Sequence, residues 1–179
     1  MRHHVKKKVK NITQQEFFDF HFKESCDFAT HTGDDLTSVY SYDNSAGTIT
    51  KDAAGVVTID SETIALNDRI LIKNQSTGSQ NGIYEVTTLG TVSVRLVLTR
   101  AGDFNADREV TSGAFVNINK GAENSDTHWV LTTDTAIILG TTALVFTVLS
   151  ANVTDLHPVG VDGTANQLLT DDGDGTVTS

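Results

Sequence analysis

The feature that most constrains the fold is a period of two in residue character, repeated in short segments from Lys51 onward. Val57 and Ile59, for example, alternate with Thr58 and Asp60, which places apolar and polar side chains on opposite faces of a strand. The segment 92–99 is expected to place four apolar side chains on one face: Val92, Val94, Leu96 and Leu98. The expected strands lie at 57–64, 69–73, 83–86, 92–99, 114–118, 128–132 and 143–150.

Turn signals separate these segments at short intervals. They are Asp43-Asn44, Ala54-Gly55, Asn81-Gly82, Leu89-Gly90, Ser112-Gly113 and Leu139-Gly140. The chain holds a single proline, and its abundant threonine suits the surface of a pleated sheet. The pattern therefore predicts an all-β fold, either an antiparallel β-sandwich or a small barrel.

The first 23 residues differ from the rest and predict a separate segment. Thr13 and Glu16 fit a capping box, and Ile12 and Phe17 fit a hydrophobic staple, which together favour a short helix over 14–21. The alternative is an extended strand, because aromatic residues alternate with polar ones over 18–22. In either form the segment is expected to anchor the chain, while 24–150 forms the β-module.

The last 29 residues change character again. Glycines interrupt 151–179, and its apolar residues are too sparse for a core, so we expect an extended stalk or linker. Asp171, Asp172 and Asp174 resemble part of a calcium loop. They lack the alternating ligands and the distant glutamate of an EF-hand, which favours a polar linker and leaves ion binding open.

Charge is unevenly distributed along the chain. Five Lys or Arg residues stand in the first ten positions, which leaves −15 on the other 169 residues of a chain that carries −10. An acidic body argues against nucleic acid as a partner. No apolar run approaches the roughly 20 residues that cross a bilayer, and no export signal follows the basic start, so we expect synthesis in a cytoplasm and no membrane insertion.

The basic residues stand beside an aromatic cluster, which predicts a docking segment. Its candidate residues are Lys6, Lys7, Lys8, Phe17, Phe18, Phe20 and Phe22. Exposed aromatic clusters need a surface against which to be buried. The alternative is that the basic tail is only a solvated chain end.

No motif in the chain predicts catalysis. The loop at 74–82 lacks the sequence and the helix of a phosphate loop and is interpreted as a hairpin connection. In the loop that begins at Arg100, Asp103 and Asn105 are expected to make local turns, braced by Arg100 or Arg108 through carboxylate pairing.

Ligand-binding motifs are also missing from the sequence. The six histidines have no metal-ligand spacing, and Cys26 is the only cysteine, expected to be a partly buried structural residue. Trp129 is expected in the core, with sugar stacking as the alternative. We therefore expect no enzymatic activity, no cofactor and no bound metal.

Several strings in order carry a family resemblance across about 26–150. These are YDNSAGTIT, VTID, NDRILIKNQ, QNGIYEV, LTRAGDFN, VTSGAFVNI, SDTHWVLTTD and LGTTALVFT. They closely resemble the β-rich module of tail-fibre and related virion fibre proteins of tailed bacteriophages. Asn117, Asn119, Lys120 and His128 depart from the usual pattern and alter a surface rather than the fold.

The resemblance implies a structural virion protein in a tail or fibre. It would be the N-terminal, particle-proximal part of a tail fibre, or a short fibre, linking the particle to host-adhesion elements. The implied partners are other virion proteins of the tail, baseplate or collar, and two further copies in a homotrimer. The alternative function is a carbohydrate-binding module that contacts a host surface glycan.

Overall fold

The computed structural model describes residues 21–34, 36, 39–149, 170–171 and 177–178. The chain divides into two compact units, Met1–Leu149 and Ser150–Ser179. The described part is all-β, with two short 3-10 helices, η1 (Gly78–Gln80) and η2 (Asp107–Glu109). The described part of the second unit pairs β12 (Thr170–Asp171) with β13 (Val177–Thr178) in antiparallel register. The rest of the expected stalk lies outside the described residues.

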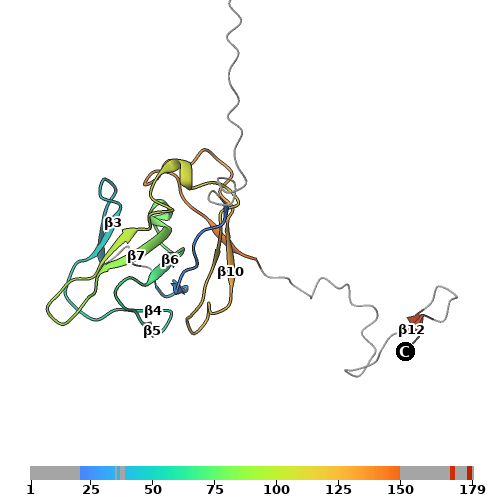
Figure 1. Cartoon of the computed structure of the whole chain (residues 1–179), viewed down its shortest axis with the longest axis horizontal. Helices are drawn as coiled ribbons and strands as arrows, with labels where there is room; N and C mark the ends of the chain where they lie inside the picture. The colour runs from blue at the N-terminus through green and yellow to red at the C-terminus, as the bar shows by residue number, and fades with distance from the viewer. Residues whose placement is uncertain (1–20, 35, 37–38, 150–169, 172–176, 179) are drawn as a thin grey trace, which may run out of the picture. The chain divides into compact units, whose positions relative to one another are not determined.

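Two main sheets build the first unit (Figure 1). The larger has the order β1-β6-β7-β8-β3-β2 and contains β1 (Phe28–Ala29), β2 (Tyr40–Asp43), β3 (Thr48–Lys51), β6 (Arg69–Ile72), β7 (Gly82–Thr88) and β8 (Val97–Arg100). The smaller has the order β11-β10-β9 and contains β9 (Phe115–Asn117), β10 (His128–Leu131) and β11 (Phe146–Val148). A short hairpin of β4 (Thr58–Ile59) and β5 (Glu62–Thr63) stands apart from both.

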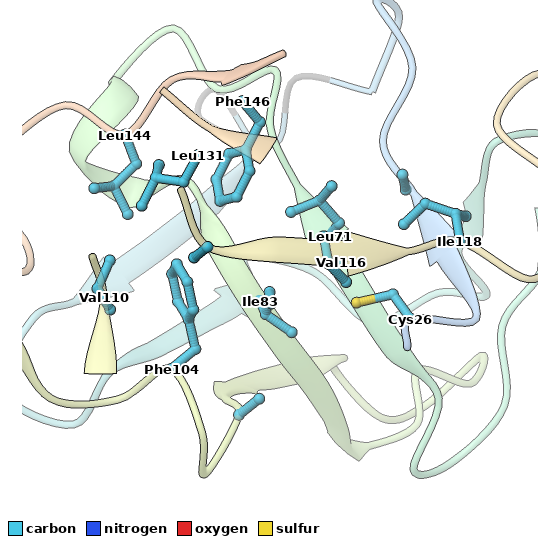
Figure 2. Packing of buried hydrophobic residues seen from close by; sticks show 13 residues of the cluster. Cys26, Leu71, Ile83, Phe104, Val110, Val116, Ile118, Leu131, Leu144 and Phe146 are labelled. Atoms are coloured by element: carbon cyan, nitrogen blue, oxygen red, sulfur yellow. The ribbon is translucent and has the colours of Figure 1, made fainter. Parts of the chain in front are cut away.

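The core has two parts, one on each face of the larger sheet. Leu71 of β6 belongs to the first cluster, which also contains Val116, Leu131 and Phe146 of the smaller sheet (Figure 2). Its neighbours Ile70 and Ile72 belong to the second cluster, on the opposite face. Alternation along β6 therefore feeds both clusters, and all four residues of this strand are buried. The first cluster makes the two sheets a sandwich.

Two expected strands differ in the structure. Thr58–Thr63 is a tight hairpin because the chain turns at Asp60 and Ser61, which have φ angles of 50° and 65°. In 92–99 only Val97 onward joins a sheet, and Thr91 and Val94 instead bridge each other across a tight turn. Val92 was expected on one face with Leu96 and Leu98, but it is 90% exposed while they are fully buried, so the shared face predicted for this segment was wrong.

The antiparallel expectation is confirmed for most pairs, with one exception at the start of the described chain. β1 pairs with β6 in parallel, Phe28 opposite Ile70. Phe22 and Cys26 form parallel bridges to Phe115 and Ile118 beside the smaller sheet. Parallel pairing cannot arise from a tight hairpin, so a sequence scan for hairpins does not find it.

The expected helix over 14–21 and the alternative strand fall almost entirely outside the described residues. Within those that are described, no helix is long and apolar enough to span a membrane.

Candidate interaction surfaces

Residues 22–30, called the bridging segment below, connect the two sheets. On one side Lys23 N donates to Phe115 O at 2.8 Å, Cys26 N to Asn117 O at 2.8 Å, and Asn119 N to Cys26 O at 2.9 Å. On the other side Asp27 N donates to Arg69 O at 2.8 Å and Thr30 N to Leu71 O at 2.9 Å. Figure 1 shows this segment, in blue, between β6 and β10. It therefore shares backbone hydrogen bonds with both halves of the sandwich.

The side chains of the bridging segment fill the interior. Cys26 and Ala29 are fully buried in the first core cluster, and Phe28 is buried in the second. Figure 2 shows Cys26 and Ile118 in the same cluster. Burial raises the pKa of the Cys26 thiol to about 12, so it is protonated near neutral pH. Cys26 is thus a structural residue.

Arg69 holds the bridging segment to the loop that follows β8. Its Nη2 lies 2.9 Å from Asp103 Oδ1 and donates to Glu24 O at 3.3 Å, while Nη1 lies 3.1 Å from Glu85 Oε1. Asp103 also accepts from Glu24 N at 3.1 Å. Burial alone would lower the pKa of Arg69, but the Asp103 contact holds it above its ordinary value, so the side chain stays charged.

The bracing expected from Arg100 or Arg108 was therefore wrong. Arg100 is buried and donates to Asn81 O at 3.1 Å, to Ser79 O at 3.2 Å and to the Tyr42 hydroxyl at 3.2 Å. Arg108 is 79% exposed and pairs only with its neighbour Glu109. Asp103 and Asn105 were expected to make local turns through their side chains, but the Asp103 carboxylate accepts from Glu24 N and Arg69 instead. At Asn105 the backbone N donates to the Glu109 carboxylate at 3.3 Å.

An aromatic row lies where the chain enters the described module. The Phe22 and Phe115 rings are 5.6 Å apart and tilted by 59°, and Phe115 stacks on His128 at 5.6 Å. His128 Nδ1 lies 2.7 Å from Asn117 Oδ1. Phe22 is 54% exposed, so this row presents apolar surface. The sequence predicted Phe22 as a docking residue but gave no signal for Phe115 or His128, which only strand register brings beside it.

The other predicted docking residues have no described position. Lys6, Lys7, Lys8, Phe17, Phe18 and Phe20 lie outside the described residues. Asp172 and Asp174 of the possible ion site lie outside them as well. Among the described residues, no group of three or more His, Cys, Asp or Glu side chains could hold a metal ion.

An apolar groove of about 340 Å³ lies beside the β4–β5 hairpin. Its lining residues are Val56, Val57, Thr63, Ile64, Leu89, Gly90, Thr91 and Val92. Val56 and Val92 are strongly exposed there. Because residues 92–96 do not join a sheet, Val92 lies on the surface instead of in the core.

A polar cavity of about 360 Å³ opens at the tip of the β2–β3 hairpin. Its lining residues are Asn44, Ser45, Ala46, Gly47, Thr99, Arg100, Asn105 and Leu139. The Arg100 guanidinium is already engaged by carbonyls and by Tyr42, so the open groups are mainly amides and hydroxyls. Such groups bind neutral polar ligands.

Neither Trp129, the residue considered for sugar stacking, nor Tyr84 offers an open ring face. Tyr84 is fully buried, and its hydroxyl donates to Gln80 O at 2.7 Å. Trp129 is half-buried against the first core cluster, and Lys73 Nζ lies 4.1 Å from its ring centroid. Its indole N–H donates to Thr127 Oγ1 at 2.9 Å. Trp129, expected in the core, therefore packs at its edge rather than inside it.

Comparison with known proteins finds no match: no family model, no curated protein and no solved structure is similar to this chain.

Proposed function

We propose that the chain is a structural module of a bacteriophage virion fibre, docked on the particle through its first residues. The observation that carries this proposal is the bridging segment. A virion protein bound to the residues before this segment would be joined to both sheets through the backbone hydrogen bonds of the segment. A fibre spacer needs such a connection, because a docked segment bonded to one edge strand alone would separate from the module more easily under load.

The strings that carry the family resemblance coincide with structured elements. YDNSAGTIT overlaps β2 and β3 and contains the turn between them, and the stretch from NDRILIKNQ to QNGIYEV contains β6 and η1 and overlaps β7. VTSGAFVNI and SDTHWVLTTD contain β9 and β10, and LGTTALVFT overlaps β11. The resemblance therefore rests on the strands and turns of the module, which supports a structural role for it.

The proposed docking surface combines charge and apolar area. The first ten residues bring five cations that steer toward an acidic site, and Phe17, Phe18, Phe20 and Phe22 supply apolar surface to bury. A fully buried phenylalanine contributes roughly 1.5–3 kcal/mol. Phe22 begins the described aromatic row, so the row would extend the docking surface onto β9 and β10.

Removal of residues 1–20 tests this proposal. The shortened chain keeps the bridging segment and should fold, but it should be missing from purified particles. Replacing Phe17 and Phe20 by alanine should cause most of the same loss. Neutralising Lys6, Lys7 and Lys8 should mainly slow docking and reduce its salt dependence. Particles that still carry a full complement of the 1–20 deletion would rule out this docking segment.

Assembly as a homotrimer is part of the proposal. It is motivated by the family resemblance and by the apolar groove, which offers surface for contact between copies. Sedimentation equilibrium at high micromolar concentration should give three times the chain mass. A single monomer species across that range would count against trimerisation through the residues present.

Host-glycan binding is the second candidate, and the polar cavity at the β2–β3 tip favours it. A glycan array should then give signals that Asn105→Ala abolishes and Asn67→Ala, at a positive-φ turn away from the cavity, leaves unchanged. An array without signal would remove this candidate and leave the structural proposal standing.

A further inference from the structure

The space between β6 and β9, called the slot below, is filled by the bridging segment. β6 and β9 belong to different sheets and do not pair with each other. The bridging segment is parallel to both, through β1 on one side and through the bridges of Phe22 and Cys26 on the other. A strand that leaves the slot would therefore expose two unpaired strand edges that face each other.

The bridging segment depends entirely on partners far along the chain. The pairs β2–β3, β6–β7, β7–β8, β9–β10 and β10–β11 join strands that follow one another and can form early. Phe28 instead pairs with Ile70, and Phe22 with Phe115, so both pairs join residues that are far apart in the sequence. Loop closure over such separations is slow, so the slot is filled late in folding.

A compact turn links the bridging segment to the body of the module. Asp34 N donates to His31 O at 3.0 Å, and the Asp34 carboxylate accepts from His31 N at 3.0 Å and from Asp60 N at 3.0 Å. Beyond the turn, Leu36 is buried in the second core cluster. The turn is therefore the position where the segment can swing while Leu36 stays in place.

We propose that the slot is a strand-exchange site, which accepts the bridging segment of a second copy of this chain. The bridging segment of a second copy fits the slot as well as the chain's own segment does. It has the same sequence, so it makes the same backbone hydrogen bonds and buries Cys26, Phe28 and Ala29 in the same way. Only the turn at His31–Asp34 changes between the closed and the exchanged form. Exchange of an identical element is a low-cost route to an oligomer. Because exchange needs two chains to meet, the exchanged fraction should rise with the protein concentration during folding. This inference does not rest on the proposed function.

The single cysteine makes exchange directly measurable in the full chain. Cys26 and Ile118 are bridge partners and lie in one core cluster, and neighbouring strands are spaced about 4.8 Å apart, within reach of a disulfide. The variant Ile118→Cys is refolded over a range of concentrations, oxidised, and run on a denaturing gel without reductant. Exchange predicts covalent multimers whose share rises several-fold with concentration. Disulfides that stay within single chains at every concentration would overturn the proposal, even in a protein that forms oligomers by other contacts.

Two controls make this result specific. Ile118→Cys combined with Cys26→Ser has one thiol and should give no covalent multimers through the slot. Asp34→Ala keeps the backbone contacts of the slot but removes the contacts of the Asp34 carboxylate with His31 N, His31 Nδ1 and Asp60 N, so it should raise the oligomer fraction several-fold in sedimentation velocity after refolding.

Asp43→Ala is the control variant, because it removes an aspartate that accepts hydrogen bonds from the backbone of a turn, from Ser45 N and Ala46 N, but at a different hairpin. It should leave the oligomer fraction of the wild-type chain unchanged. Equal oligomer fractions in Asp34→Ala, Asp43→Ala and wild type would contradict exchange. This comparison does not depend on Ile118→Cys, so it tests the proposal even if that variant fails to fold.

Discussion

At the scale of single residues, Arg69 connects parts of the module that lie far apart in the sequence. It stands on β6 and reaches Asp103 after β8, Glu85 on β7 and the Glu24 carbonyl of the bridging segment. Its side chain is 9% exposed, so these charged contacts are screened less than those of a surface pair. Nothing in the sequence pattern singles out Arg69, because its partners are distant along the chain and only the sheet register brings them together.

Arg69→Met should therefore lower the free energy of unfolding by about 2–4 kcal/mol, since it leaves Asp103 without its cation. Urea denaturation followed by tryptophan fluorescence measures this difference. Arg108→Met is the matched control: its 79% exposed pair with Glu109 should contribute less than about 1 kcal/mol. Equal effects of the two substitutions would show that the Arg69 contacts do not hold the module together.

His31 gives the turn after the bridging segment a pH dependence. Its Nδ1 lies 2.7 Å from Asp34 Oδ2, and this contact raises the pKa of His31 above its ordinary value of 6.5. The stabilisation is complete below that ordinary value and is lost as pH rises through the raised pKa. The stability difference between wild type and His31→Asn should therefore shrink from pH 5 to pH 9, measured by urea midpoints. A difference that is constant across this range would contradict the contact.

At the scale of elements, period-two alternation predicted strands well where both flanking turns are local. β6, β7, β9, β10 and β11 all lie within the expected ranges or overlap them closely. Gly82 has the positive φ expected at Asn81-Gly82, at 148°, but it begins β7 and lies against Arg100, so the position is a strand start rather than a turn.

Alternation failed where long-range contacts decide the backbone. The Asp60 carboxylate is fully buried and accepts from Glu123 N at 3.1 Å and from Asn124 N at 2.9 Å, which fixes the turn that divides 57–64. For the bridging segment the pattern missed a strand instead of predicting a false one. Residues 22–30 show little alternation, and their strand character comes from the two sheets beside them. Of the aromatic row, the sequence analysis named Phe22 but not its neighbours Phe115 on β9 and His128 on β10.

Two substitutions within 92–99 test the corrected strand boundary. Val92 is 90% exposed, so Val92→Ser should change the free energy of unfolding by less than about 0.5 kcal/mol. Leu98 is fully buried, so Leu98→Ala should cost about 2–5 kcal/mol. Chemical denaturation measures both. A large loss from Val92→Ser in the isolated, monomeric protein would restore the shared apolar face.

At the scale of the whole molecule, the expected anchor and the module share residues. Phe22 and Lys23, the last residues of the expected anchor, contact β9. Phe22 therefore belongs to both the proposed docking surface and the module.

Two truncations separate these roles. Removal of residues 1–20 should leave the melting temperature within a few degrees of the full chain. Removal of 1–26 also takes away Cys26 and the hydrogen bonds of Lys23 and Cys26 to β9, and should lower it by roughly 10 °C or more. Differential scanning calorimetry compares the two. Equal melting temperatures would show that the bridging segment is not part of the cooperative module.

The central claim is that the chain docks on a virion through the residues that lead into the bridging segment. An electron-microscopy map of the intact particle tests it most directly. The account predicts density that continues from His21 and Phe22 into a neighbouring virion protein, with the aromatic row of Phe22, Phe115 and His128 at or beside that contact. A map in which the module attaches by another surface, with its Phe22 end directed into solvent, would contradict it.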